Sequence, residues 1–231
     1  MAIRENVVLI RERIVAACHR AHRSPGDVQL MAVSKTKPVE MIREAYEAGI
    51  TVFGENYVQE FAGKYSAIGE LRIEWHLIGH LQSNKSSLAT ELFDAVDALD
   101  SLKLAARLNR DALALHKTLD VLLEINIGNE ESKTGLAPES PELLELLRAF
   151  ERLEALQLRG LMSIPPITDE PEESRAYFRR LREMRDELAA LNLPRVELDE
   201  LSMGMTHDFE IAIEEGSTCV RIGTAIFGER D

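Results

Sequence analysis

The chain has 231 residues, of which 45% are hydrophobic and 29% are charged. This balance is typical of a folded globular protein and excludes fibrous and disordered classes. A formal net charge of −13 repels polyanions, so we expect no nucleic-acid partner. No stretch approaches the roughly 18 unbroken apolar residues of a membrane span, so we expect no membrane contact either.

The two cysteines, Cys18 and Cys219, lie far apart, and neither belongs to a CxxC motif or a Cys/His cluster. This pattern favours neither a disulfide framework nor a structural zinc site, and it predicts a location in the reducing cytoplasm.

The first predicted element is an amphipathic helix over 3–21, where Val7, Ile10, Ile14 and Ala17 recur at spacings of three and four. Eight short apolar runs follow, and each leads into a helical pattern. We expect these runs to be strands, at 30–34, 51–54, 74–79, 92–99, 119–127, 156–164, 197–204 and 217–223.

Strands that alternate with helices and are almost continuously apolar predict a parallel sheet buried on both sides. Eight such units in about 200 residues predict a closed (β/α)8 TIM barrel with an extra N-terminal helix, in a single domain over 1–231. An open doubly wound sheet is the alternative. Its usual phosphate-binding loops, G-x-G-x-x-G and GxxxxGK[ST], are absent from the sequence.

In such a barrel the site lies at the carboxyl ends of the strands. The first strand leads into Lys35, which is either an ordinary surface charge or a partly desolvated amine that can attack a carbonyl. After the eighth strand, which carries Arg221, come Gly223 and Thr224, and the seventh leads into Thr206. Loops seven and eight often bind phosphate in barrels, so we expect a phosphate site on the rim that carries Lys35, unless the glycines only make turns.

Other polar groups give weaker signals. His76 and His80 have metal-pair spacing only if they lie on a helix, and the strand-like EWHLIG argues against one. Glu55 and Asp208 are expected to cap helices or to hold cationic neighbours. The basic run over 175–185 is interleaved with acidic residues, which favours a solvated helix face over a binding patch.

Seven motifs, in order along essentially the whole chain, resemble the pyridoxal phosphate homeostasis proteins, which are related to the N-terminal barrel of alanine racemase. They are AVSKTKP (32–38), FGENYVQE (53–60), WHLIGHLQSNK (75–85), SKTG (132–135), RGLMSIPP (159–166), SMGMTHDFEIAI (202–213) and VRIGTAIFG (220–228). Two positions depart from the family pattern: Thr206 replaces a serine, and His80 stands where a proline or another residue often occurs.

The resemblance implies that Lys35, and not Lys37, forms a Schiff base with pyridoxal 5'-phosphate. Arg221 would face the pyridine nitrogen and leave it unprotonated, which damps carbanion chemistry. The implied cofactor-binding residues are Lys35, Asn56, His76, Met205, Thr206, Arg221, Gly223 and Thr224.

Racemases of this type carry a second catalytic base on a separate C-terminal domain, for which we expect no room after the last predicted helix. The groups that would have to replace that base lack a compelling position: Tyr46, Tyr57, Tyr65, Tyr177 and the histidines. We therefore expect a monomeric, non-catalytic carrier or buffer of pyridoxal phosphate that meets apo-enzymes transiently. An amino-acid racemase, or a barrel enzyme that uses Lys35 on a phosphorylated carbonyl compound, are the alternatives.

Overall fold

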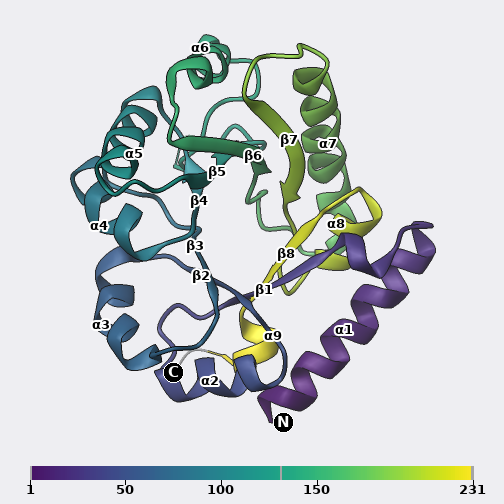
Figure 1. The fold of residues 1–231 in the computed structure, drawn as a ribbon. Helices are drawn as coiled ribbons and strands as arrows, with labels where there is room; N and C mark the ends of the chain where they lie inside the picture. The colour runs from purple at the N-terminus through teal and green to yellow at the C-terminus, as the bar shows by residue number, and fades with distance from the viewer. Residues whose placement is uncertain (1, 131, 230–231) are drawn as a thin grey trace.

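The computed structural model describes residues 2–130 and 132–229, and its strands close into a barrel in the order β1 to β8 (Figure 1). Each strand runs parallel to its neighbours, and β1 pairs with both β2 and β8. The strands are β1 (Gln29–Val33), β2 (Val52–Glu55), β3 (Glu74–Leu77), β4 (Ala95–Leu99), β5 (Leu119–Glu124), β6 (Leu156–Met162), β7 (Val196–Ser202) and β8 (Cys219–Ile222). The predicted (β/α)8 barrel is confirmed, and the open-sheet alternative is wrong.

Helices surround the barrel on its outside (Figure 1). They are α1 (Ile3–Arg20), α2 (Val39–Glu47), α3 (Val58–Ile68), α4 (Ser86–Leu92), α5 (Leu102–Ala114), α6 (Pro141–Ala149), α7 (Arg175–Ala189), α8 (Phe209–Glu214) and α9 (Thr224–Phe227). Local signals define their starts: the Ser140 hydroxyl caps α6 by accepting from the Leu143 N–H. Across the described ranges, every helix is too short or too polar to cross a membrane.

The two faces of the barrel sheet differ in chemistry. The outer face packs on the helices through large apolar groups, such as Phe53 and Trp75, whose ring centroids lie 5.4 Å apart. A separate, smaller cluster that includes Met31 and Val52 fills part of the barrel interior. Because side chains alternate along a strand, His76 faces the interior while its neighbour Trp75 faces the helices. Polar groups that face inward are therefore candidates for function.

The N-terminal helix α1 packs against the last βα unit of the barrel (Figure 1). Its apolar stripe is buried, as the spacing of three and four predicts. The Asn6 side-chain amide donates to the carbonyl oxygen of Ile226 in α9 at 2.9 Å. The Arg20 guanidinium pairs with Glu214 of α8 at 2.7 Å. The helix therefore covers the part of the barrel where the first and last strands meet.

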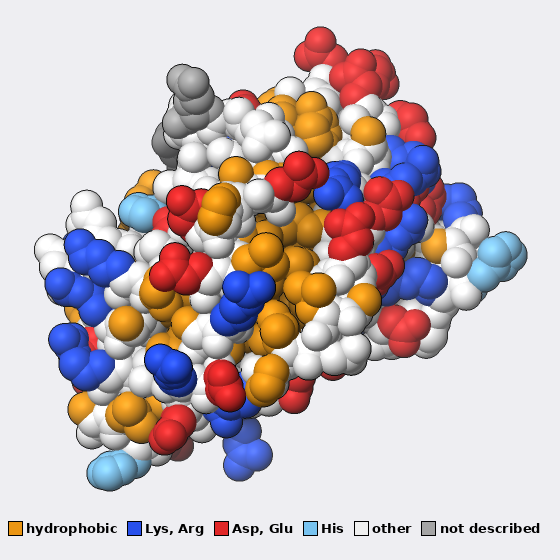
Figure 2. Space-filling view, turned by 90° about the horizontal axis from the view of Figure 1, so that it is seen from above, with side chains coloured by type: hydrophobic (Ala, Val, Ile, Leu, Met, Phe, Trp, Pro, Cys, Tyr) orange, Lys and Arg blue, Asp and Glu red, His pale blue; other side chains and the backbone are white. Residues whose placement is uncertain are grey.

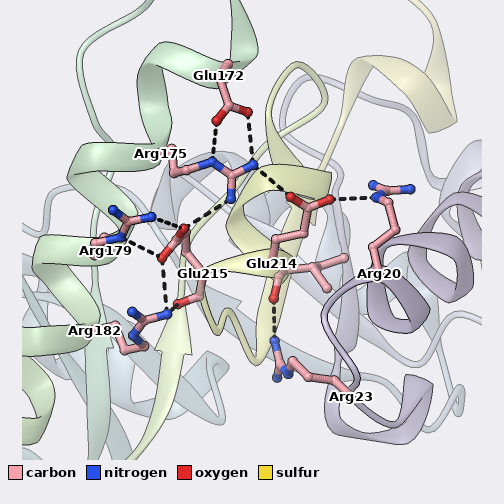
Figure 3. A network of polar contacts seen from close by, with 9 residues as sticks. Arg20, Arg23, Glu172, Arg175, Arg179, Arg182, Glu214 and Glu215 are labelled. Carbon is pink, nitrogen blue, oxygen red and sulfur yellow. Dashed lines mark hydrogen bonds and ion pairs between the residues drawn. The ribbon is translucent and has the colours of Figure 1, made fainter.

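An ion-pair network joins α7 to α8 (Figure 3). Buried Glu215 accepts from three arginines of α7: Arg175 at 3.1 Å, Arg179 at 2.9 Å and Arg182 at 3.1 Å. Arg175 also donates to Glu214 at 2.7 Å. These arginines belong to the basic run that was predicted to be a solvated helix face. Their side chains stay 24%, 52% and 34% exposed, so this part of the run lies on a partly solvated helix face, and it also holds a buried carboxylate that the sequence did not predict.

The charges on the neighbouring surface are mixed. Figure 2 shows hydrophobic side chains at the centre of the upper face of Figure 1, with basic and acidic groups alternating toward the side where α7 lies. Arg180, for example, pairs with exposed Glu187 at 2.9 Å. Such alternation prevents a continuous positive patch on this face.

Candidate functional site

Lys35 lies at the carboxyl mouth of the barrel, which we define as the end where the strands finish. Strand β1 ends at Val33, which packs on the interior cluster. The next side chain, Ser34, points outward and donates to Glu55 Oε1 at 2.8 Å. Half-buried Lys35 follows directly, in the turn after the strand end, and so stands at the carboxyl mouth.

Lys37, two residues further along, has a different environment. Its Nζ donates to the carbonyl oxygens of Gly228 at 3.3 Å and Glu229 at 3.0 Å. The ammonium of Lys37 is therefore engaged by the backbone that follows α9. This geometry favours Lys35 over Lys37 as the reactive lysine.

The loops after β7 and β8 meet beside Lys35. The Thr206 hydroxyl accepts from the Ala225 N–H at 3.5 Å, which brings the two loops together. Gly223 lies against β1: a Cβ built on this residue would be 3.4 Å from the carbonyl oxygen of Val33. Thr224 is exposed at the start of α9. The residues predicted to bind phosphate and Lys35 are thus at the same mouth.

Contacts within the protein fix the conformation of the turn between β7 and α8. The Met205 N–H donates to Asp208 Oδ1 at 2.8 Å, so this carboxylate closes the turn before the helix. Gly204 has a φ of 94°, and a Cβ there would lie 2.5 Å from the Cβ of Ala212. The glycine therefore allows α8 to pack closely on the strand end.

Arg221 is a buried cation of the barrel interior, only 3% exposed. Its guanidinium donates to Ser202 Oγ at 2.7 Å and to the carbonyl oxygen of Ser163 at 2.8 Å. Both partners are neutral, and no carboxylate in the described part of the chain forms an ion pair with it. Burial lowers the pKa of this guanidinium. A buried cation with only neutral partners suits an additional electron-rich ligand atom.

Several buried polar atoms lack hydrogen-bond partners within residues 2–130 and 132–229, among them Glu55 Oε2 on the outer face of β2. Three others lie near the carboxyl ends of β2, β5 and β6: Asn56 Oδ1, Glu124 Oε2 and Ser163 Oγ. Glu124 uses its other oxygen to accept from the Thr134 hydroxyl at 2.8 Å, and burial raises its pKa. Buried polar atoms are nearly always satisfied in folded proteins, so these three are consistent with a polar ligand at the carboxyl mouth.

His76 lies deeper in the barrel, toward the opposite end. Its Nδ1 contacts Asp97 Oδ1 at 2.8 Å, and its Nε2 contacts Glu74 Oε1 at 3.2 Å. Although burial lowers the pKa of the imidazole, these two carboxylates raise it to about 10. Both ring nitrogens are thus engaged below the carboxyl mouth, and a role for His76 beside a cofactor ring stays a prediction. His80 lies beyond the end of β3, where its Nδ1 contacts Asp100 at 3.1 Å.

The amino mouth, at the other end of the barrel, holds a cavity of about 230 Å³. Its charged lining residues include Asp27, Glu74, Asp97, Asp120, Arg159 and Glu200. Of the residues predicted to bind a cofactor, this lining contains only His76.

Sequence reasoning missed the groups that support Lys35 and Arg221. The Ser202 hydroxyl and the Ser163 carbonyl oxygen accept from the guanidinium, and both residues stand within motifs that were inspected for other residues. Glu60 and Lys64 hold the backbone beside Lys35 from α3. Their i,i+4 spacing after the second strand is a signal that could have identified them as a pair on one helix face.

Residues 2–231 match the family model described as alanine racemase, N-terminal domain. This match defines the class of the protein as a barrel of the alanine racemase type. An alanine racemase from Clostridium difficile shows the same fold, with a TM-score of 0.75 at 16% identity, over 99% of this chain and 56% of the racemase chain.

Two more similar proteins narrow that class. The pyridoxal phosphate homeostasis protein of Aquifex aeolicus is 47% identical over 226 residues, which cover 98% of this chain and 97% of that protein. PipY of Synechococcus elongatus, solved with PLP bound, is 40% identical with a TM-score of 0.81, over 95% of this chain and 100% of that one. The chain belongs to the pyridoxal phosphate homeostasis protein family, as the sequence motifs predicted.

Proposed function

We propose that this chain binds pyridoxal phosphate at the carboxyl mouth and that Lys35 provides the amine that condenses with its aldehyde. The shared mouth carries the proposal, because Lys35 follows β1 at the end where the loops after β7 and β8 meet and supply hydroxyl and N–H groups suited to a phosphate. When bound, the cofactor supplies an electrophilic aldehyde and an electron-withdrawing ring. Thr206, Gly223 and Thr224 would hold its phosphate, and Met205 and Asn56 would line the space beside them.

Arg221 sets the reactivity of the site. A guanidinium donates hydrogen bonds and stays charged, so beside the pyridine nitrogen it does not keep a proton there as a carboxylate would. Its contacts to Ser202 and Ser163 fix its orientation within the interior. This arrangement supports a role in which the protein holds the cofactor and does not activate it for catalysis.

The positions of the tyrosines support a role without substrate turnover. Tyr46, Tyr65 and Tyr177 lie on α2, α3 and α7, which surround the barrel on its outside. Tyr57 follows Asn56, and its side chain is 59% exposed. None of these four phenols lies in the barrel interior, where a second catalytic base would act. We therefore propose a carrier or buffer of pyridoxal phosphate, cytoplasmic and monomeric, with transient apo-enzyme partners.

The binding proposal is tested by adding pyridoxal phosphate to the purified protein, reducing with borohydride and mapping the modified lysine by mass spectrometry. We expect modification of Lys35, its loss in Lys35→Ala and its retention in the control Lys37→Ala. If borohydride fixed as much pyridoxal phosphate to Lys35→Ala as to the wild type, the assignment of Lys35 would be refuted.

The absence of turnover is tested separately, by incubating the cofactor-loaded protein with single L-amino acids in deuterated water. We expect no exchange of the α-proton beyond that caused by free pyridoxal phosphate. Rapid exchange together with a D-amino-acid product would establish a racemase instead.

A further inference from the structure

Three side chains outside the barrel hold the loop that carries Lys35. We call Glu55, Glu60 and Lys64 the clamp. Lys64 Nζ lies 3.1 Å from Glu55 Oε1 and 2.6 Å from Glu60 Oε1, and it also donates to the carbonyl oxygen of Ser34 at 3.2 Å. The clamp therefore contacts the peptide unit that leads directly into Lys35.

The residue on the other side of Lys35 is held as well. Thr36 has a φ of 63°, in the left-handed region that a β-branched residue rarely adopts. Its N–H donates to Glu60 Oε1 at 2.7 Å. Because this conformation is unfavourable for threonine, a charge-assisted hydrogen bond is needed to maintain it. Lys35 thus stands between two anchored backbone units.

The burial of the clamp makes its contacts specific. The side chain of Glu55 is 0% exposed and that of Lys64 is 14% exposed, so solvent screens their attraction weakly. The Ser34 hydroxyl donates to the same oxygen of Glu55 that faces Lys64. These contacts reach the backbone on both sides of Lys35, and they approach from the outer face of the barrel.

We propose that Lys64 is a positioning residue that aims Lys35 at the carboxyl mouth by holding the Ser34 carbonyl and ordering Glu60 against the Thr36 N–H. This inference rests on the proposed function, because it concerns how Lys35 captures the aldehyde. Lys64 acts through the backbone of the loop and does not touch the cofactor. Its loss lets the loop leave the left-handed conformation, so the amine of Lys35 is presented in many directions.

The test compares Lys64→Met with a matched control, Lys117→Met. Lys117 is also partly buried and also donates to main-chain carbonyls, those of Thr90 and Phe93, beside α4. Hydrogen exchange of the Thr36 amide in the ligand-free protein reports loop order. Two titrations report binding, one with pyridoxal phosphate and one with pyridoxine 5'-phosphate, which has the same phosphate and no aldehyde.

In Lys64→Met we expect Thr36 exchange to accelerate and pyridoxal phosphate to bind about tenfold more weakly, since small misplacements of a reacting group have effects of this size or larger. Pyridoxine 5'-phosphate should bind as it does to the wild type, because the loops after β7 and β8 are intact. Lys64→Arg keeps the charge and should recover part of the loss. Glu60→Ala serves as a second variant, since Glu60 is 27% exposed and its removal leaves the pair of Glu55 and Lys64.

Wild-type exchange and wild-type aldehyde capture in both Lys64→Met and Glu60→Ala would overturn the inference. An equal loss in Lys117→Met would also overturn it, because the effect would then be general destabilisation. Should wild-type Lys35 itself capture no cofactor, the proposed function fails and this inference with it. Failure of the Lys64 and Glu60 variants alone leaves the proposed function in place.

Discussion

The two mouths of the barrel use buried polar groups in opposite ways. At the amino mouth, charged groups form ion pairs with one another: His76 lies between Asp97 and Glu74, and Arg159 pairs with Glu197 at 2.6 Å. At the carboxyl mouth, the Arg221 guanidinium has only neutral partners in the described residues, and atoms such as Glu124 Oε2 have none. The amino mouth therefore holds its buried imidazole between carboxylates of the protein, although Asp97 Oδ2 has no hydrogen-bond partner in the described residues, whereas the carboxyl mouth leaves its buried guanidinium without an ion pair there.

This difference indicates where stability and function are located. Unpaired buried polar groups cost free energy, so folding alone does not favour the arrangement at the carboxyl mouth. In barrels, residues at this end serve the site, whereas those at the amino end serve stability. Variants at the two ends should therefore affect different measurements.

The largest effect on folding is expected for Asp97→Ala. It removes the buried partner of His76 and leaves the imidazole with Glu74 alone, and breaking comparable buried pairs costs about 3–5 kcal/mol. Urea unfolding at neutral pH measures the loss. The added change His76→Leu should recover part of it, because it removes the buried imidazole that has lost Asp97. A loss below about 1 kcal/mol would remove the contrast between the mouths.

A smaller effect is expected from pH. The carboxylates of Asp97 and Glu74 hold the pKa of His76 at about 10, against an ordinary value of 6.5. A raised histidine pKa contributes stability that is complete below pH 6.5 and is lost as pH rises through about 10. The free energy of unfolding should therefore fall over this window more steeply in the wild type than in His76→Gln. Parallel pH profiles would show that His76 is not held as a cation.

The smallest effect is expected at the carboxyl mouth, for Glu124→Gln. Burial raises the pKa of this carboxyl, so its ionised form opposes folding at neutral pH. The amide keeps an acceptor for Thr134 and removes the charge, which should stabilise the fold by up to about 1 kcal/mol. By the same sign argument, the gain should vanish as pH falls below 4.5, the ordinary pKa of glutamate. Clear destabilisation at neutral pH would mean that Glu124 serves the fold.

The sequence predicted the barrel well because strand and helix periodicities are local. All eight apolar runs became strands, with shifted ends such as β4, which begins at Ala95 instead of residue 92. Lys35 and Lys37 have similar neighbours in the sequence, so local patterns do not distinguish them. Only the tertiary contacts of Lys37 with Gly228 and Glu229 show that the two lysines have different environments. The ion pairs of α7 with Glu215 could not be predicted from local patterns either, because their partners are 33 to 40 residues apart in the sequence.

The pairing of β1 with β8 also has a consequence for the order of assembly. Lys35 is translated well before Arg221, Gly223 and Thr224. Because domains fold as units during and after synthesis, the ring cannot close until β8 joins β1. A nascent chain therefore carries the reactive amine without the loops that select the cofactor, and only the completed ring offers both.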